Sequence, residues 1–295
     1  MNPFKQLYDR LPAGTRSSIR SWMPDPLKRW YAHRNTDVYL ISYPKCGRTW
    51  LRLMIGRALA QNFGLAEDEE TLFIRWNQRP HRQVPWITVV HDDRPMLKTP
   101  EELETCKVRY QDKQVIFLAR DPRDVIVSSY FEMNNRGRLF GDTPYESRQA
   151  VFEGSLPDFI RNRTGGFETI LRYYNIWAEN RKIPRGFLLV RYEDMKADAQ
   201  HELRRVIDFL GLESIPDGIL AEAVEYASFE NMRKMESQGQ FKSGMLKPAD
   251  QSNQDSFKTR RGKVKGFADH LEQADIAFLN QTMGEKLSDY FGYQA

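Results

Sequence analysis

The chain has 295 residues, a length that allows one large or two small domains around a substantial buried core. Its 44 Lys and Arg residues against 40 Asp and Glu residues leave a net charge of +4, which suits an anionic ligand but is too small to favour nucleic acid as a partner. No apolar run approaches the length of a membrane span, and the N-terminus lacks the apolar core of a signal peptide. We therefore expect a soluble cytoplasmic protein in which Cys46 and Cys106 are free thiols.

Residues 1–34 form a basic segment that contains seven Lys or Arg residues and two Asp residues. Phe4, Leu7, Tyr8 and Leu11 recur in it at helical spacing. Such a segment can lie on an anionic membrane surface, or it can pack on the domain as an ordinary N-terminal helix. Peripheral membrane contact is thus one of two alternatives for residues 1–34, and residues 35–295 are expected to form one domain.

Short β-branched or aromatic runs alternate with helical patterns along this domain, which predicts an α/β fold with a central parallel sheet flanked by helices. Strands are expected at 38–42, 86–90, 114–118 and 187–191, and helices at 49–62, 125–133, 167–180, 198–210 and 272–290. Residues 238–259 are polar and rich in turn-forming residues, which predicts a mobile loop.

A strand, tight turn and helix are predicted around Lys45, because an apolar run stops at Pro44 and a helical pattern begins at Thr49. Such a turn directs backbone N–H groups and a helix N-terminus toward one point, which suits a phosphate group. Gly262-Lys263 is the only Gly-Lys pair, and it lacks the upstream Gly and the following Ser or Thr of an ATP-binding Walker A loop. Cys46 in the turn is explained by its small size, with a redox or nucleophilic role as the alternative.

A second strand-to-helix junction carries Arg120-Asp-Pro-Arg-Asp124 and, two helical turns later, Ser128. Arg120 and Ser128 can converge on a second anion, to which a guanidinium gives a bidentate contact. The alternative is a surface cluster of salt bridges among Arg120, Asp121, Arg123 and Asp124.

Together the two junctions resemble the cytosolic-type sulfotransferases that use 3′-phosphoadenosine 5′-phosphosulfate (PAPS) and release 3′-phosphoadenosine 5′-phosphate (PAP). The segment 43–50 resembles the family's Tyr-Pro-Lys-Ser-Gly-Thr-Thr-Trp loop, with Cys46 and Arg48 substituted. The segment 120–128 resembles its 3′-phosphate motif, and 190–196 and 257–263 resemble two later motifs in the same order. The resemblance covers residues from about 38 to 271 and implies the family's nucleotide-kinase-like fold.

The resemblance implies a role for each matching residue. Backbone N–H groups and the Thr49 hydroxyl would hold the 5′-phosphate, and Trp50, Tyr192 and Phe229 would border adenine. Ala227 stands where the family often has a Thr, so one contact to the base is missing. The implied cofactor-binding residues are Lys45, Cys46, Gly47, Arg48, Thr49, Trp50, Arg120, Ser128, Tyr192, Phe229, Arg260, Arg261 and Gly262.

Lys45 and His91 are the candidate catalytic residues. A lysine suits the charge that develops on the departing phosphate oxygen, and a histidine can take the proton of the acceptor. His91 follows a predicted strand at its carboxyl end and occupies the position of the base in the family's Lys-Thr-His motif. Val89 stands where that motif has lysine, so Arg48 or Lys98 is a candidate for the missing cation.

The sequence thus predicts transfer of a sulfuryl group from PAPS to a hydroxyl or amine acceptor without a metal. One alternative is a phosphotransferase, whose Mg²⁺ would have 190–194 as the nearest ligand segment. Another is a nucleotide-binding protein without turnover. The acceptor can be a small molecule, a glycan or a lipid, and the oligomeric state is not indicated. Several aromatic residues can line an acceptor pocket or belong to the core: Phe73, Trp76, Trp86, Phe131, Phe140, Tyr145 and Phe152.

Overall fold

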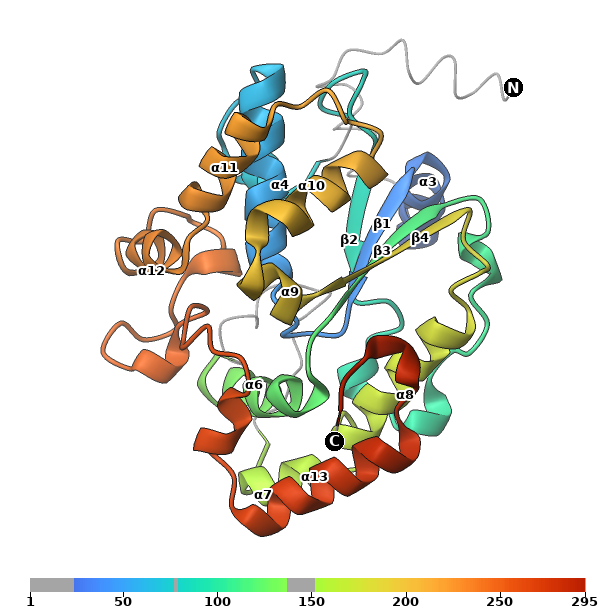
Figure 1. Cartoon of the computed structure of the whole chain (residues 1–295), viewed down its shortest axis with the longest axis vertical. Helices are drawn as coiled ribbons and strands as arrows, with labels where there is room; N and C mark the ends of the chain where they lie inside the picture. The colour runs from blue at the N-terminus through green and yellow to red at the C-terminus, as the bar shows by residue number, and fades with distance from the viewer. Residues whose placement is uncertain (1–23, 77–78, 137–151, 295) are drawn as a thin grey trace.

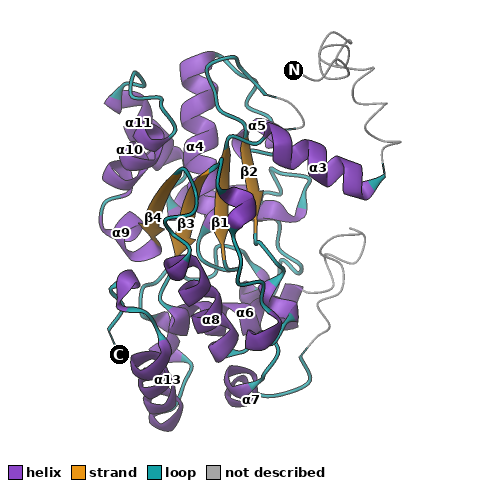
Figure 2. Cartoon of the chain, turned by 90° about the vertical axis from the view of Figure 1, so that its right-hand side faces the viewer, coloured by secondary structure: helices purple, strands orange, loops and turns teal. Residues whose placement is uncertain are grey.

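A computed structural model of the chain describes residues 24–76, 79–136 and 152–294. Its centre is a sheet of four parallel strands in the order β2-β1-β3-β4, seen side by side in Figure 2. The strands are β1 Val38–Ser42, β2 Ile87–Val90, β3 Gln114–Ala119 and β4 Gly186–Arg191, each within one residue of its predicted bounds. The predicted parallel α/β sheet is therefore confirmed.

Burial explains why β1 and β3 occupy the centre of the sheet. All five residues of β1 are buried, as are the last five of the six residues of β3, and almost all of them are apolar. A strand that is covered on both faces needs an uninterrupted apolar sequence of this kind. Leu40 of β1 pairs with Val89 of β2 on one side and with Ile116 of β3 on the other.

The helices form two groups, which Figure 1 shows in the upper and lower parts of the molecule. The upper group contains α4, α10 and α11, and the lower group contains α6, α7, α8 and α13. The helices are α3 Asp25–Asn35, α4 Arg48–Phe63, α5 Glu69–Leu72, α6 Pro122–Arg136, α7 Leu156–Arg161, α8 Phe167–Glu179, α9 Tyr192–Ala197, α10 Ala199–Phe209, α11 Asp217–Tyr226, α12 Phe229–Ser237 and α13 Gln273–Lys286. No helix in these three described ranges is long and apolar enough to cross a membrane.

The helix predicted over 272–290 is shorter in the structure. It ends at Lys286 because Leu287 is extended, with φ −82° and ψ 134°, and a single 3₁₀ turn follows at Asp289–Phe291. The apolar pattern that predicted the longer helix ran through Leu287 to Tyr290, but Tyr290 belongs to the 3₁₀ turn and is 37% exposed.

Two predicted segments are only partly tested. Residues 1–23 of the basic N-terminal segment lie outside the described residues, whereas α3 is described, with Leu27 and Trp30 each 52% exposed. The polar segment 238–259 contains 3₁₀ turns at Gly244–Leu246 and Gln254–Ser256 and buries Phe241. Its predicted mobility stays a prediction.

Aromatic packing between β3 and α8 connects the core to the carboxyl ends of the strands. Phe117 packs against Tyr173, Tyr174 and Trp177 of α8, with ring centroids 5.7 to 6.1 Å apart. Both tyrosines also form hydrogen bonds through their hydroxyl groups, because a buried hydroxyl needs a partner. Tyr173 donates to the backbone oxygen of His91 and Tyr174 to that of Arg120, each at 2.9 Å.

Candidate active site

A cavity of about 1600 Å³ opens at the carboxyl ends of the four strands. Lys45 follows β1, His91 follows β2, Arg120 follows β3 and Tyr192 follows β4, and all four line this cavity. Parallel strands bring their carboxyl ends to one edge of the sheet, which is where ligands bind in open α/β folds. The topology thus gathers residues that lie far apart in the sequence.

The loop after β1 has a backbone shape that suits an anion. Lys45 and Gly47 both have left-handed backbone angles, with φ of 72° and 90°, and Gly47 precedes the first residue of α4. Trp50 and Leu51 donate to the Gly47 oxygen at 3.0 and 3.2 Å, whereas the N–H groups that precede them have no carbonyl partner within the helix. The start of α4 therefore presents N–H groups and a positive dipole end to the cavity.

Cys46 is turned away from this cavity. Its side chain is fully buried, and its Sγ lies 3.3 Å from the Tyr174 hydroxyl. Burial raises the pKa of the Cys46 thiol to about 12. A thiol that is neutral at physiological pH and out of reach of a substrate does not suit the nucleophilic or redox alternative. Of the predicted cofactor-binding residues, Cys46 alone does not line the cavity, and only its backbone can serve there.

Lys45 lies in an ionic cluster that the sequence analysis did not include. Its Nζ is 2.6 Å from Oε2 of Glu132, and the other carboxylate oxygen of Glu132 accepts a hydrogen bond from Lys258 Nζ at 3.1 Å. Glu132 comes one helical turn after Ser128 on α6, so its position on the cavity face of that helix was available from the spacing. Lys258 belongs to the late segment 257–263 that the resemblance singled out.

His91 is oriented by its backbone surroundings. Its Nδ1 lies 2.9 Å from the Ser42 carbonyl oxygen, which can only accept, so Nδ1 carries the proton and Nε2 has a lone pair. Burial, together with the positive charge of Arg48, holds the pKa of His91 well below its ordinary value. The imidazole is therefore neutral at physiological pH and able to accept a proton at Nε2.

The turn after His91 is strained and held by buried charges. Asp92, Asp93 and Arg94 all have positive φ, of 38°, 63° and 49°, which is uncommon for residues other than glycine. The Asp92 carboxylate is fully buried, forms ion pairs with Lys107 and Arg109, and accepts a hydrogen bond from Tyr110 at 2.7 Å. We expect these contacts to keep the turn, and with it His91, in place. The sequence carried no signal for them, because these residues lie up to eighteen positions apart in a loop region.

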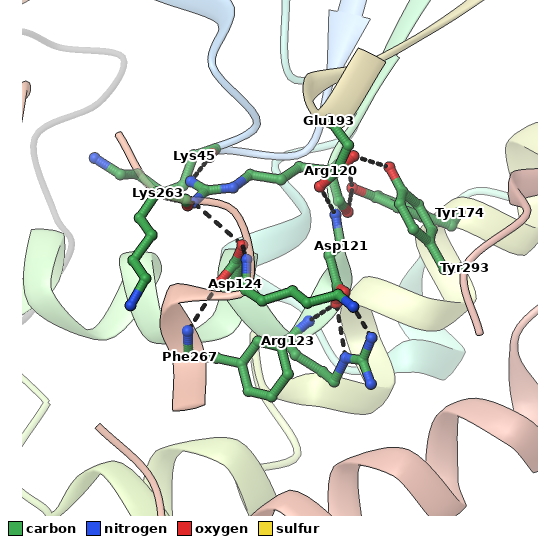
Figure 3. A network of polar contacts seen from close by, with 11 residues as sticks. Lys45, Arg120, Asp121, Arg123, Asp124, Tyr174, Glu193, Lys263, Phe267 and Tyr293 are labelled. Carbon is green, nitrogen blue, oxygen red and sulfur yellow. Dashed lines mark hydrogen bonds and ion pairs between the residues drawn. The ribbon is translucent and has the colours of Figure 1, made fainter. Parts of the chain in front are cut away.

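Arg120 joins the loop after β1 to the segment near residue 263 (Figure 3). Its Nη1 donates to the Lys45 oxygen at 3.3 Å and its Nη2 to the Lys263 oxygen at 3.1 Å. The guanidinium also lies 4.4 Å from the Tyr192 ring centroid and 3.5 Å from the Asp124 carboxylate. Its Nε is buried and has no hydrogen-bond partner among the described residues.

The acidic and basic residues around Arg120 do not form a surface cluster. Asp121, Arg123 and Asp124 are all less than 8% exposed. Arg123 binds Asp121 through two nitrogen atoms at 2.7 and 2.9 Å, and Asp124 accepts from the N–H groups of Lys265 and Phe267 at 2.9 Å (Figure 3). The predicted ion pairs exist, Arg123 with Asp121 and Arg120 with Asp124, but they lie largely buried and not on the surface. The contacts of Asp124 hold residues 265–267 against α6.

Three aromatic residues line one part of the cavity. The Trp50 and Tyr192 rings are 5.7 Å apart, and Phe229 stands at the start of α12. Two glycines make room for this arrangement. A Cβ on Gly47 would lie 2.6 Å from the Tyr192 ring, and a Cβ on Gly262 would lie 2.6 Å from the Phe229 ring. The indole N–H of Trp50 is buried and has no hydrogen-bond partner among the described residues.

The described members of the aromatic group considered for an acceptor pocket lie outside the cavity. Phe73 and Trp86 are buried, and none of the described members of that group lines the cavity. Phe140 and Tyr145 lie outside the described residues. The apolar and aromatic residues that do line the cavity include Tyr39, Val90, Met96, Leu97 and Tyr110, and charged residues such as Arg94, Lys98 and Arg109 lie among them in the sequence.

Comparisons with protein families, with known sequences and with solved structures agree with this architecture. The sulfotransferase domain model matches residues 35–291. The chain is 26% identical over 275 residues to flavonol 3-sulfotransferase of Flaveria bidentis, covering 87% of this chain and 83% of that protein. It is 23% identical over 288 residues to sulfotransferase 2A1 of Mus musculus, covering 96% and 95% of the two chains.

Two solved structures share the fold. Mouse sulfotransferase SULT7A1 complexed with PAP superposes with a TM-score of 0.58 at 19% identity, covering 87% of each chain. Retinol dehydratase in complex with androsterone and PAP superposes with a TM-score of 0.55 at 17% identity, covering 86% of this chain and 81% of the other. Since the domain model spans the sheet, both helix groups and the cavity, the chain belongs to the sulfotransferase family.

Proposed function

We propose that the cavity binds PAPS and that Lys45 and His91 carry out transfer of its sulfuryl group to an acceptor. The observation that supports this most directly is the placement of the two residues. They follow the neighbouring strands β1 and β2 and line one cavity, with a helix N-terminus beside Lys45 and a neutral, oriented imidazole at His91. An enzyme of the sulfotransferase family uses a cavity of this kind to hold donor and acceptor in line.

The donor fits the cavity in three parts. The start of α4 and the Thr49 hydroxyl hold the 5′-phosphate through N–H and O–H donors. Arg120, Ser128 and the segment 260–262 hold the 3′-phosphate, and the buried Nε of Arg120 is a donor without another partner among the described residues. Trp50, Tyr192 and Phe229 border adenine, which stacks on aromatic rings.

Sulfuryl transfer needs in-line geometry and charge stabilisation, as phosphoryl transfer does. The acceptor oxygen attacks sulfur while the bond from sulfur to the 5′-phosphate oxygen breaks, and negative charge develops on that oxygen. The ammonium group of Lys45 stabilises this charge. The acceptor loses its proton to Nε2 of His91, which is unprotonated because Nδ1 donates to the Ser42 oxygen.

We propose a small molecule as acceptor. The apolar residues in the cavity lining, such as Val90, Met96 and Leu97, favour a compact, partly apolar molecule over an extended glycan. The solved retinol dehydratase is in complex with androsterone and PAP. The names of the cytosolic plant relatives favour a cytoplasmic location. Membrane contact through residues 1–34 stays a prediction.

A phosphotransferase is not favoured. Its Mg²⁺ would need the carboxylates of the segment 190–194, and neither of them lines the cavity. Glu193 accepts hydrogen bonds from the Asp121 N–H and the Tyr293 hydroxyl, each at 2.9 Å, and Asp194 pairs with Arg191 at 2.7 Å. These contacts give both carboxylates a structural role.

The function is tested by incubating the protein with labelled PAPS and a panel of phenols, steroids and sugars, with and without EDTA. We expect PAP and a sulfated product whose yield does not depend on EDTA. Calorimetry should show binding of PAP, and Lys45→Ala should abolish transfer. Failure of the wild-type protein to bind PAP or PAPS would overturn the proposal, whereas Mg²⁺-dependent consumption of ATP would support the phosphotransferase.

A further inference from the structure

Two lysines share one buried carboxylate in the cavity. Glu132 has a side chain only 9% exposed, and its two oxygens bind Lys45 at 2.6 Å and Lys258 at 3.1 Å. The carboxylate therefore holds the second ammonium group next to the first. With Lys45 assigned to the leaving oxygen by the proposed function, Lys258 lies beside the group that is transferred.

Lys258 is held in this position by a second buried carboxylate. Glu236 of α12 is fully buried and accepts from the backbone N–H of Lys258 at 2.6 Å and from that of Thr259 at 2.9 Å. The Thr259 hydroxyl adds a third hydrogen bond to Glu236 at 2.6 Å. A carboxylate is buried at a cost unless hydrogen bonds compensate it, so these bonds define a specific conformation. The side chain of Lys258 is only 23% exposed and lines the cavity.

The sequence offered two candidates for a supporting cation, and both line the cavity. Lys98 forms an ion pair with Asp93, the second residue of the strained turn after His91, and Arg48 is the first residue of α4. Val89 lines the cavity but has no charge to offer. Lys258 and Arg48 both contribute to the lowered pKa of His91, after the larger effect of burial, so the charge of Lys258 acts at the imidazole as well as at Glu132.

We propose that Lys258 is a catalytic residue whose ammonium group binds the non-bridging oxygens of the sulfuryl group during transfer. Lys258 thereby replaces the family lysine, whose position is occupied by Val89 in this chain. This inference rests on the proposed function. An ammonium carries three N–H donors, and Glu132 uses one of those of Lys258, so contact with the sulfuryl group does not require the ion pair to break.

The reaction step is a displacement at sulfur. The acceptor oxygen, or water in its absence, forms a new bond to sulfur as the bond to the 5′-phosphate oxygen breaks. The electron pair of the broken bond stays on PAP, next to Lys45, and the proton of the nucleophile moves to Nε2 of His91. Throughout the step, Lys258 neutralises charge on the oxygens that sulfur retains.

The test needs no identified acceptor, because release of PAP from PAPS with water as nucleophile reports the same step. We would compare wild type, Lys258→Met, Lys258→Met with Val89→Lys, and Lys247→Met. Lys247 is an exposed lysine of the polar segment 238–259, which also contains Lys258, and it does not line the cavity, so its variant is the control. PAP release is followed by chromatography, and binding of PAP, which lacks the sulfuryl group, by calorimetry.

We expect Lys258→Met to release PAP about 100-fold more slowly than wild type, which is the typical effect of removing one donor to a transition state. Its affinity for PAP should stay within about twofold of wild type. Val89→Lys should restore part of the rate, and Lys247→Met should behave as wild type. An unchanged rate in Lys258→Met, an equal loss of PAP affinity, or a double variant no faster than the single one would overturn the inference. If wild type does not bind PAP, the proposed function itself fails, which is a separate result.

Discussion

Replacing Arg120 by alanine tests whether this residue holds the 3′-phosphate. The side chain is 13% exposed, so a contact to phosphate there is little screened by solvent. Loss of a charge-assisted hydrogen bond costs about 1.5 to 3 kcal/mol. This corresponds to a loss of PAP affinity of about 10- to 150-fold.

The same substitution also removes the ties of Arg120 to the oxygens of Lys45 and Lys263. Part of the loss in affinity therefore reflects loosening of the two loops, and the variant should be less stable by about 1 to 3 kcal/mol. Calorimetric titration with PAP measures the first effect, and urea unfolding measures the second.

Arg123→Ala is a matched control for this prediction. Arg123 is a buried arginine three residues away that binds Asp121, Asn280 and the Gln294 oxygen and does not line the cavity. Breaking its buried pair should lower the free energy of unfolding by about 3 kcal/mol and leave PAP affinity within about twofold of wild type. If folded Arg120→Ala binds PAP as wild type does, or if Arg123→Ala loses as much affinity, the assignment of Arg120 to the phosphate is wrong.

Two further predictions concern His91 and Gly47. Because the pKa of His91 is held well below its ordinary value of about 6.5, kcat/KM for PAPS should fall only at a pH well below that value. His91→Gln should lose this fall at acid pH and about 100-fold or more in turnover while still binding PAP. A variant that keeps both the fall and the wild-type rate would exclude His91 as the base. Gly47→Ala should lose about 1 kcal/mol or more of stability and about tenfold in PAP affinity, since its Cβ meets the Tyr192 ring. Gly64 has φ of +61° but open space where a Cβ would lie, so Gly64→Ala should lose stability alone. Equal PAP affinity in Gly47→Ala and Gly64→Ala would show that the contact with the Tyr192 ring does not affect binding.

The lowered pKa of His91 also makes stability depend on pH. The unfolded state binds a proton at about pH 6.5, whereas the folded state resists protonation until a lower pH. The contribution of neutral His91 to the free energy of unfolding is therefore fully present above pH 6.5 and is lost as pH falls toward the pKa of the folded state. Unfolding of wild type and His91→Gln in urea at pH 7.5 and 5.5 measures the difference.

Local sequence determined the strands and the loops that follow them. The apolar runs of β1 and β3 predicted strands, and the structure places both strands at the centre of the sheet, where both faces of a strand are buried. Lys45, His91 and Arg120 were identified because each directly follows such a run, and parallel strands end at one edge. Gly47 was expected at a tight turn, and its left-handed backbone angle explains that choice of residue.

Only the tertiary structure decided which side chains face that edge and which charges meet there. Cys46 lies in the predicted phosphate loop, yet its side chain is buried in the core beside the Tyr174 hydroxyl. The charged residues after β3 have the composition of a surface cluster, and folding buries them beneath the late segment. Glu132 and Lys258 are 126 residues apart in the sequence and meet through one hydrogen bond. A contact of that separation leaves no periodic pattern, because it depends on how α6 and the segment after α12 pack and not on the sequence near either residue.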